Sequence, residues 1–217
     1  MKKTTRTETA TLLVLALALG GTWLAHPARA RAAISPAEVG ARRFVEDTID
    51  TVMGVLRDGG LSLEQKKDRV QSIAYERFDF ALISRLVLAR NWKRMSPQQQ
   101  ADFVDAFKQH LAATYRDTLD NYRDETITID ASRLESNGDV TVMTRVHGAT
   151  GDTKVDYRLR QGDAAWRGID VIVEGVSLVQ NFRSQAQEII SSEGADALIQ
   201  KLRNKQIDLE TGTKKGG

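Results

Sequence analysis

The stretch from Trp166 to Gln185, WRGIDVIVEGVSLVQNFRSQ, predicts a buried strand that passes through a glycine turn directly into a helix. Apolar residues at alternate positions of 169–173 are typical of a strand with one buried face. Gly175 interrupts this extended pattern, and Ser177 is placed to cap a following helix. An apolar sheet wall therefore meets an apolar helix surface at this corner. The pattern fits a packed core as well as it fits the wall of a binding site.

Three segments upstream of this corner also predict strands. Residues 127–129, 140–146 and 155–159 alternate between apolar and polar, and turn-forming residues separate them at 136–139 and 148–152. The second of these turns, Gly148-Ala149-Thr150-Gly151-Asp152, fits a hairpin loop better than a phosphate-binding loop. Four strands in a meander, each apolar on one face, predict an antiparallel sheet that must be covered on that face.

The first half of the chain predicts helices that can cover such a sheet. Capping signatures at Ser35 and Ser62 begin two helices, over 36–58 and 63–75, and a third is expected from Asp79 to about Ala89. Ser96-Pro97 begins a fourth helix that continues toward residue 122. This fourth helix carries an apolar stripe made of Phe103, Phe107, Leu111, Tyr115 and Leu119. Helices followed by strands and closing helices predict an α+β fold.

Residues 1–32 have the pattern of a secretory signal peptide. A basic start is followed by an unbroken apolar run over 12–19 and by small-x-small sequences between 28 and 32. An uncleaved anchor is the alternative, but the run stops at 20–21, short of the ~20 apolar residues that a spanning helix needs. We therefore expect cleavage and export, a single domain over 33–208, and a disordered tail over 209–217 that has almost no apolar content. Because the chain has no cysteine, neither a lipid anchor at the cleavage site nor a disulfide is expected.

The charge balance of the chain argues against a nucleic-acid partner. Five of the 31 basic residues but only one of the 29 acidic residues lie in residues 1–32, so the remainder has a formal charge of −2. Phosphate backbones are bound by concentrated basic surfaces, and the remainder contains no basic block of that kind.

The sequence contains no motif that predicts catalysis. His110 and His147 are isolated from other metal-ligating residues, so neither a metal nor another cofactor is predicted. Asp156 and Asp170 could act as an acid and a base inside a cone-shaped sheet, which keeps an isomerase-like enzyme open as an alternative. The simpler interpretation is that Asp156 lies on the solvated sheet face with Arg158, and that Asp170 pairs with a neighbouring base. We therefore predict a protein that is not an enzyme.

Several motifs, in order along the chain, resemble the MlaC family of periplasmic phospholipid-binding proteins, also called the toluene-tolerance family. They are Phe78-Asp79-Phe80, Trp92, Ser96-Pro97, the aromatic residues of the fourth helix, Trp166, Asp170, Glu174-Gly175-Val176-Ser177 and the segment 179–185. The similarity covers nearly all of the chain after the signal peptide. One departure is Ala89, because relatives often have glycine at this position, before a tryptophan or tyrosine.

This resemblance implies a monomeric carrier that moves phospholipid through the periplasm. Its partners would be an outer-membrane lipoprotein complex and an inner-membrane MCE-domain ABC transporter, with transient contact at membrane surfaces. The implied fold is a cone-like sheet covered by helices, as in nuclear transport factor, with acyl chains in an apolar slot between them. A hopanoid-associated relative of the same family is the nearest alternative, and its signature usually lacks the pattern Asn-aromatic-Arg-Ser found at 181–184.

The apolar stripes supply the residues expected to enclose the lipid, although the sequence does not separate core from slot. The predicted lipid-binding set is Leu82, Leu86, Val87, Phe103, Phe107, Leu111, Tyr115, Val142, Val146, Val155, Tyr157, Ile169, Val171, Val173, Val176 and Val179. The helical pattern places Arg183 on an exposed face near the glycine turn. Arg183 is therefore predicted either to contact a phosphate or docking partner at the rim, or to form a surface salt bridge.

Overall fold

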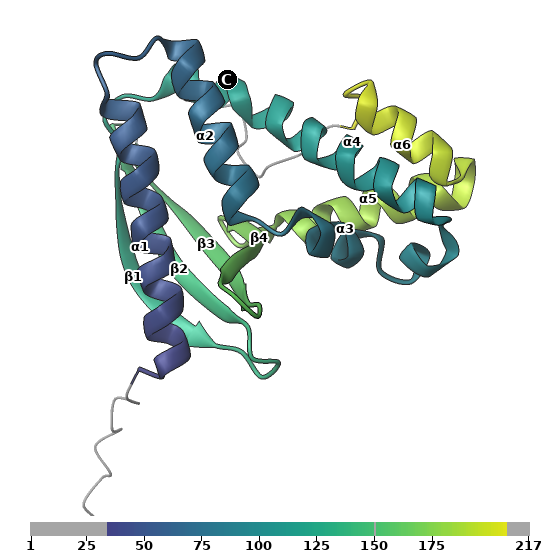
Figure 1. Ribbon diagram of the computed structural model, residues 1–217, viewed down its shortest axis with the longest axis horizontal. Helices are drawn as coiled ribbons and strands as arrows, with labels where there is room; N and C mark the ends of the chain where they lie inside the picture. Colours follow the sequence, from purple (N-terminus) through teal and green to yellow (C-terminus); the bar gives the residue numbers. More distant parts are fainter. Residues whose placement is uncertain (1–33, 150, 208–217) are drawn as a thin grey trace, which may run out of the picture. The chain divides into compact units, whose positions relative to one another are not determined.

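The computed structural model describes residues 34–149 and 151–207 (Figure 1). The predicted signal peptide and the predicted tail lie outside the described residues. Within them, a layer of helices faces an antiparallel sheet, which confirms the predicted α+β fold.

Five strands in sequential order form the sheet, and each strand is antiparallel to its neighbours. Their bounds are β1 Thr126–Leu134, β2 Val140–Gly148, β3 Gly151–Gln161, β4 Trp166–Val173 and β5 Val176–Ser177. The first four strands confirm the predicted meander. The two-residue strand β5 was not predicted, and it extends the sheet beyond β4.

Six α-helices and two short 3₁₀ segments complete the described part of the chain. Their bounds are α1 Pro36–Arg57, α2 Leu63–Arg77, α3 Phe80–Leu88, η1 Ala89–Arg94, α4 Pro97–Arg116, η2 Asp117–Asn121, α5 Leu178–Glu193 and α6 Ala195–Arg203. The predicted capping boxes begin α1 and α2, through Ser35 with Glu38 and Ser62 with Gln65. The predicted fourth helix ends earlier than expected, because it tightens into η2 before residue 122.

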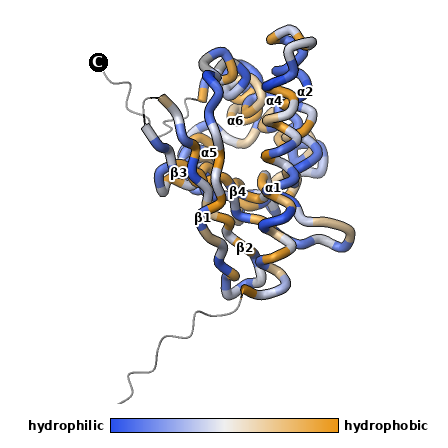
Figure 2. The backbone as a smooth tube through the Cα atoms, turned by 90° about the vertical axis from the view of Figure 1, so that its left-hand side faces the viewer, coloured by the Kyte–Doolittle hydropathy of each residue, from blue (hydrophilic) through white to orange (hydrophobic). Residues whose placement is uncertain are grey.

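Two separate apolar cores hold these elements together. In the first, α1 lies against the sheet, where Ala41 and Val45 pack with Val140, Val142 and Leu159. Hydrophobic and hydrophilic positions alternate along α1 in Figure 2, as this one-sided packing requires. The second core lies among α3, α4, α5 and α6 and includes a cluster of aromatic rings.

The joint between α2 and α3 fixes the helices to strand β4. The Asp79 backbone amide donates to the Gly168 carbonyl at 3.0 Å, and the Asp79 carboxylate caps α3 by accepting from the Leu82 amide. The ring of Phe78 lies so close to Gly168 that a Cβ atom there would be 2.5 Å from two ring carbons. The Phe78-Asp79-Phe80 sequence is therefore a structural junction that needs a glycine on β4.

The corner after β4 is a two-residue turn. Val173 pairs with Val176 across this turn, and the two residues between them have positive φ, 48° at Glu174 and 83° at Gly175. A type I′ turn requires positive φ at both central positions. The Ser177 hydroxyl then accepts a hydrogen bond from the Gln180 amide, which confirms the predicted helix cap.

Candidate functional site

A cavity of about 370 Å³ lies between α2, the end of α4 with η2, and the strands β3 to β5. Its walls are mostly apolar side chains from these elements and from the α2–α3 joint. From the helices come Val70, Ala74, Tyr75, Leu111, Ala112, Tyr115 and Leu119, and from the sheet and the start of α5 come Tyr157, Val171, Val173, Val176 and Leu178. A cavity of this size with apolar walls falls in the range of small-molecule binding sites.

The sequence of α2 explains why this space is not filled. Among the 15 residues of α2, the one buried residue is Lys67. Apolar residues such as Val70 and Ala74 are only partly covered and face the space beneath the helix. The Phe78 joint holds the C-terminal end of the helix. The space between the helix and the apolar surface of the sheet therefore stays unfilled.

A second, smaller cavity of about 160 Å³ lies between α1, α2 and the sheet. Val70, Ala74, Phe78 and Tyr157 line both cavities. These four side chains therefore form the wall that separates the two cavities. Burial in this wall raises the pKa of the Tyr157 hydroxyl above its usual value, because the ionised form would lose its hydration.

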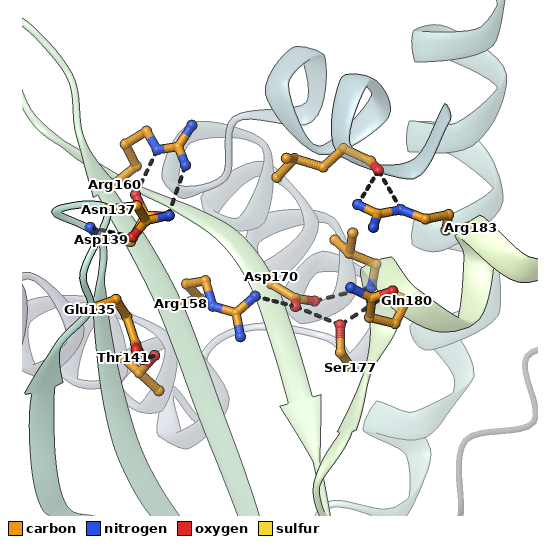
Figure 3. A network of polar contacts seen from close by, with 12 residues as sticks. Glu135, Asn137, Asp139, Thr141, Arg158, Arg160, Asp170, Ser177, Gln180 and Arg183 are labelled. Atoms are coloured by element: carbon orange, nitrogen blue, oxygen red, sulfur yellow. Dashed lines mark hydrogen bonds and ion pairs between the residues drawn. The ribbon is translucent and has the colours of Figure 1, made fainter. Parts of the chain in front are cut away.

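The Asp170 carboxylate fixes the sheet side of the main cavity (Figure 3). Its Oδ2 accepts from the Ser177 hydroxyl at 2.6 Å and from Arg158 at 3.4 Å, and its Oδ1 accepts from the Val179 amide at 3.0 Å. This network joins β3, β4 and the start of α5. The predicted pairing of Asp170 with a neighbouring base is confirmed, and both of its oxygens are engaged in holding the corner.

A group of charged residues lies at the other end of the cavity. Lys67 and Arg116 both line it, and the Glu64 carboxylate bridges them, with one oxygen 3.2 Å from Lys67 Nζ and the other 2.8 Å from Arg116 Nη2. Asp120 lies 2.7 Å from Lys67, and Asp68 lies 2.8 Å from Arg116. The hydrogen bonds that Lys67 donates to Asp120 and Glu64 raise its pKa, so this ammonium group is charged at neutral pH.

The structure divides the predicted lipid-binding set between the cavity and the cores. Six of these residues line the main cavity: Leu111, Tyr115, Tyr157, Val171, Val173 and Val176. Val87, Phe103, Phe107 and Val179 are buried in the helical core, with Leu86 packed against it, and Val142 is buried in the core beneath α1. Leu82, Val146, Val155 and Ile169 belong to the walls of neither cavity.

Several cavity residues were not in the predicted set. Val70 and Ala74 are four positions apart on α2, a helical spacing that could have identified them. Leu119 continues the apolar stripe of α4 and was left out of the set. The sequence did not indicate that Lys67 and Arg116 line the cavity, because charged residues on a helix are usually solvated.

Arg183 is half-buried, and not exposed as predicted. Its guanidinium donates two hydrogen bonds to the Leu86 carbonyl, at 2.9 Å from Nε and 2.6 Å from Nη2 (Figure 3). The end of α3 is thereby fixed to α5. A docking role for Arg183 stays a prediction, while its structural contact accounts for the position of the side chain.

The remaining candidate polar residues occupy separate places. His110 is buried beside Phe182, and His147 contacts Asp152 on neighbouring strands. Asp156 lies half-buried on the sheet face opposite the cavity, and burial raises the pKa of its carboxyl. Within residues 34–149 and 151–207, the metal-ligating side chains form no group of three or more that could hold an ion.

Comparison with known proteins identifies the family. Residues 46–204 match the MlaC protein family. The chain belongs to the MlaC family. Over 116 residues it is 28% identical to the toluene tolerance protein ttg2D of Pseudomonas putida, covering 52% of this chain and 54% of the relative. Over 122 residues it is 25% identical to the intermembrane phospholipid transport system binding protein MlaC of Haemophilus influenzae, covering 54% of this chain and 57% of the relative.

The chain thus aligns with a little over half the length of these two relatives. A similar solved structure is that of a phospholipid-binding protein from Ralstonia solanacearum in complex with a phospholipid. It has a TM-score of 0.66 and 27% identity, and the match covers 79% of this chain and 97% of the other. Among the described residues of this MlaC family member, no helix is both long and apolar enough to cross a bilayer.

Proposed function

We propose that this chain is a non-catalytic phospholipid carrier of the periplasm, which holds acyl chains in the cavity between α2 and the sheet. The apolar cavity of about 370 Å³ is the observation that carries the proposal. The similar Ralstonia solanacearum protein, which was solved with a phospholipid, supports it. Its partners would be an outer-membrane lipoprotein complex and an inner-membrane MCE-domain ABC transporter, between which lipid would move.

The energetics of a carrier fit this arrangement. Burying one methylene is worth about 0.8 kcal/mol, so an acyl chain with ~14 buried methylenes gains roughly 11 kcal/mol over its state in water. A carrier must stabilise the acyl chains nearly as much as a bilayer does and still release the lipid. A preformed apolar cavity meets the first need without any covalent step. Weak burial of α2, with Lys67 as its one buried residue, provides a wall that costs little to move.

Filling the cavity from within should test the proposal. Replacing Ala74 and Ala112 together by leucine adds apolar volume to two walls without changing helix propensity appreciably. The double variant should take up several-fold less phospholipid from vesicles, measured by native mass spectrometry and by organic extraction of the re-isolated protein. The matched control replaces Ala81 and Ala101, which are exposed on α3 and α4, by leucine.

The control variant should load like the wild type. A wild-type protein that takes up no phospholipid from vesicles would contradict the carrier function. Equal loading of the two double variants would place the acyl chains elsewhere. A polycyclic lipid in place of diacyl lipid in the extract would favour the hopanoid-associated function.

A further inference from the structure

The cavity has one chemically distinct end. Most of its wall is apolar, but Lys67 near the start of α2 and Arg116 at the end of α4 bring two cations to the same place. Figure 1 shows these two helix ends converging, and the charge contacts between them join the helices. The exposed fractions of the Glu64 and Asp68 side chains are 66% and 69%, so this end of the cavity opens to solvent.

A single carboxylate links the two cations. Glu64 Oε1 lies 3.2 Å from Lys67 Nζ, and Glu64 Oε2 lies 2.8 Å from Arg116 Nη2. A phosphate group has several acceptor oxygens on one centre and can make the same bridge, with charge-assisted hydrogen bonds to both cations. Because Glu64 is mostly exposed, it can turn into solvent when another anion takes its place.

We propose that Lys67 and Arg116 bind the phosphate of the lipid head group at this end of the cavity, where the phosphate replaces Glu64 between them. This inference rests on the proposed carrier function and adds a head-group site to it. Two acyl chains attached to that phosphate would extend past Tyr115 toward the apolar walls. Lys67 is suited to the role, because its side chain is only 7% exposed and lines the cavity.

The charges around the site also select a class of head group. The two cations that line the cavity are paired with three carboxylates, Glu64, Asp68 and Asp120. A phosphate that enters this group leaves an excess of negative charge. A head group that carries its own ammonium would restore the balance by pairing with the displaced carboxylates, whereas an anionic head group would not. The site therefore favours zwitterionic over anionic phospholipid.

Two neutral variants test the phosphate contacts. Lys67→Met keeps the apolar stem of the lysine, and Arg116→Met removes the guanidinium. Each protein is incubated with vesicles of equal parts phosphatidylethanolamine, phosphatidylglycerol and diacylglycerol, re-isolated, and extracted for mass spectrometry. Each variant should retain about tenfold less phosphatidylethanolamine than the wild type, a loss typical of one charge-assisted contact. Diacylglycerol, which has the chains but no phosphate, should be retained as in the wild type.

The matched control is Arg203→Met. It removes a guanidinium that pairs with Asp102 at 2.8 Å, the same distance as in the Arg116–Glu64 pair, but neither Arg203 nor Asp102 lines the cavity. This control should retain both lipids as the wild type does. Glu64→Gln provides a test that leaves both cations in place. It should increase phosphatidylglycerol retention several-fold relative to phosphatidylethanolamine, because it removes one of the carboxylates that repel an anionic head group.

The possible outcomes distinguish a failure of the head-group site alone from a failure of the carrier function. Equal loss of diacylglycerol and phosphatidylethanolamine in the methionine variants would overturn the phosphate site, because the cations would then only hold the cavity open. A wild-type preference for phosphatidylglycerol would overturn the assignment to zwitterionic lipid. A wild type that binds neither phospholipid nor diacylglycerol would overturn the carrier function and the site together.

Discussion

The two ends of α4 carry one continuous apolar stripe but lie in different surroundings. At the N-terminal end, Phe103 and Phe107 stack at 5.5 Å between ring centroids, and Phe182 of α5 contacts Phe107 edge-on at 4.7 Å. At the C-terminal end, Leu111 and Tyr115 face the cavity. The apolar stripe predicts that both ends of α4 are covered by other elements. Whether the space between α4 and the covering element is filled depends on the side chains of that element.

The opposing elements differ in what they can bury. Helices α5 and α6 present Phe182, Leu198 and Leu202 to the N-terminal half of α4, and all three are nearly inaccessible to solvent. Helix α2 presents partly covered residues and one buried lysine to the C-terminal half. A closed core and an open site therefore arise from the same helix, because only one of its ends meets a helix with a full apolar face.

The largest expected difference between the two ends comes from truncating an aromatic side chain at each. Phe107→Ala should lower the free energy of unfolding by about 3–5 kcal/mol, because it removes a ring from a close-packed core. Tyr115→Ala should cost less than about half of that, since part of its surroundings is already empty. Urea denaturation of both variants measures the difference. Equal losses would show that the cavity end is as tightly packed as the core.

The next expected effect concerns the joint that fixes α2 and α3 to β4. Gly168→Ala should destabilise the protein by about 1–3 kcal/mol, because its Cβ would lie 2.5 Å from two carbons of the Phe78 ring. Since Phe78 lies in the wall between the two cavities, its displacement should also change lipid loading.

Gly54→Ala is the control for Gly168→Ala. Gly54 lies within α1 with no atom near the added Cβ, so alanine there should stabilise by about 0.5–1 kcal/mol. Thermal unfolding of both variants tests the pair. A Gly168→Ala variant as stable as the wild type would mean that the Phe78 ring moves without cost.

The two ends of α4 also show which features can be predicted from the sequence. The helix starts at Ser35 and Ser62 were predicted correctly, because a capping box depends on residues three positions apart. The strands and the glycine corner were predicted from alternation and turn residues, which are also local. The division of the α4 stripe into core and cavity was not predictable, because it depends on where α2 lies. Val142 and Val171 have the same pattern in the sequence, yet only Val171 lines the cavity.

A smaller effect is expected at the closed end, where α3 ends. Ala89 has a φ of 48°, a conformation that favours glycine. Ala89→Gly should therefore stabilise the protein by about 1 kcal/mol, because it relieves backbone strain. Ala101→Gly, on an exposed face within α4, should have the opposite sign and cost about 0.5–1 kcal/mol. Chemical denaturation measures both, and destabilisation by Ala89→Gly would contradict strain at this position.

The smallest expected effect is a pH dependence of the unfolding free energy that arises at the cavity end of α4 and not at its closed end. Burial raises the pKa of Tyr157 at the cavity, whereas the stacked rings of the closed core are phenylalanines that do not titrate. The unfolded tyrosine ionises near pH 10, so the stability linked to this group is complete below that pH and is lost as pH rises toward the higher folded pKa. Tyr157→Phe should remove this loss. Its unfolding free energy should match the wild type near pH 7 and fall less steeply above pH 10, by at most about 1.4 kcal/mol per pH unit. Urea titrations from pH 7 to 11 measure the slopes, and parallel slopes would show that Tyr157 ionises as freely in the folded protein as in the unfolded chain.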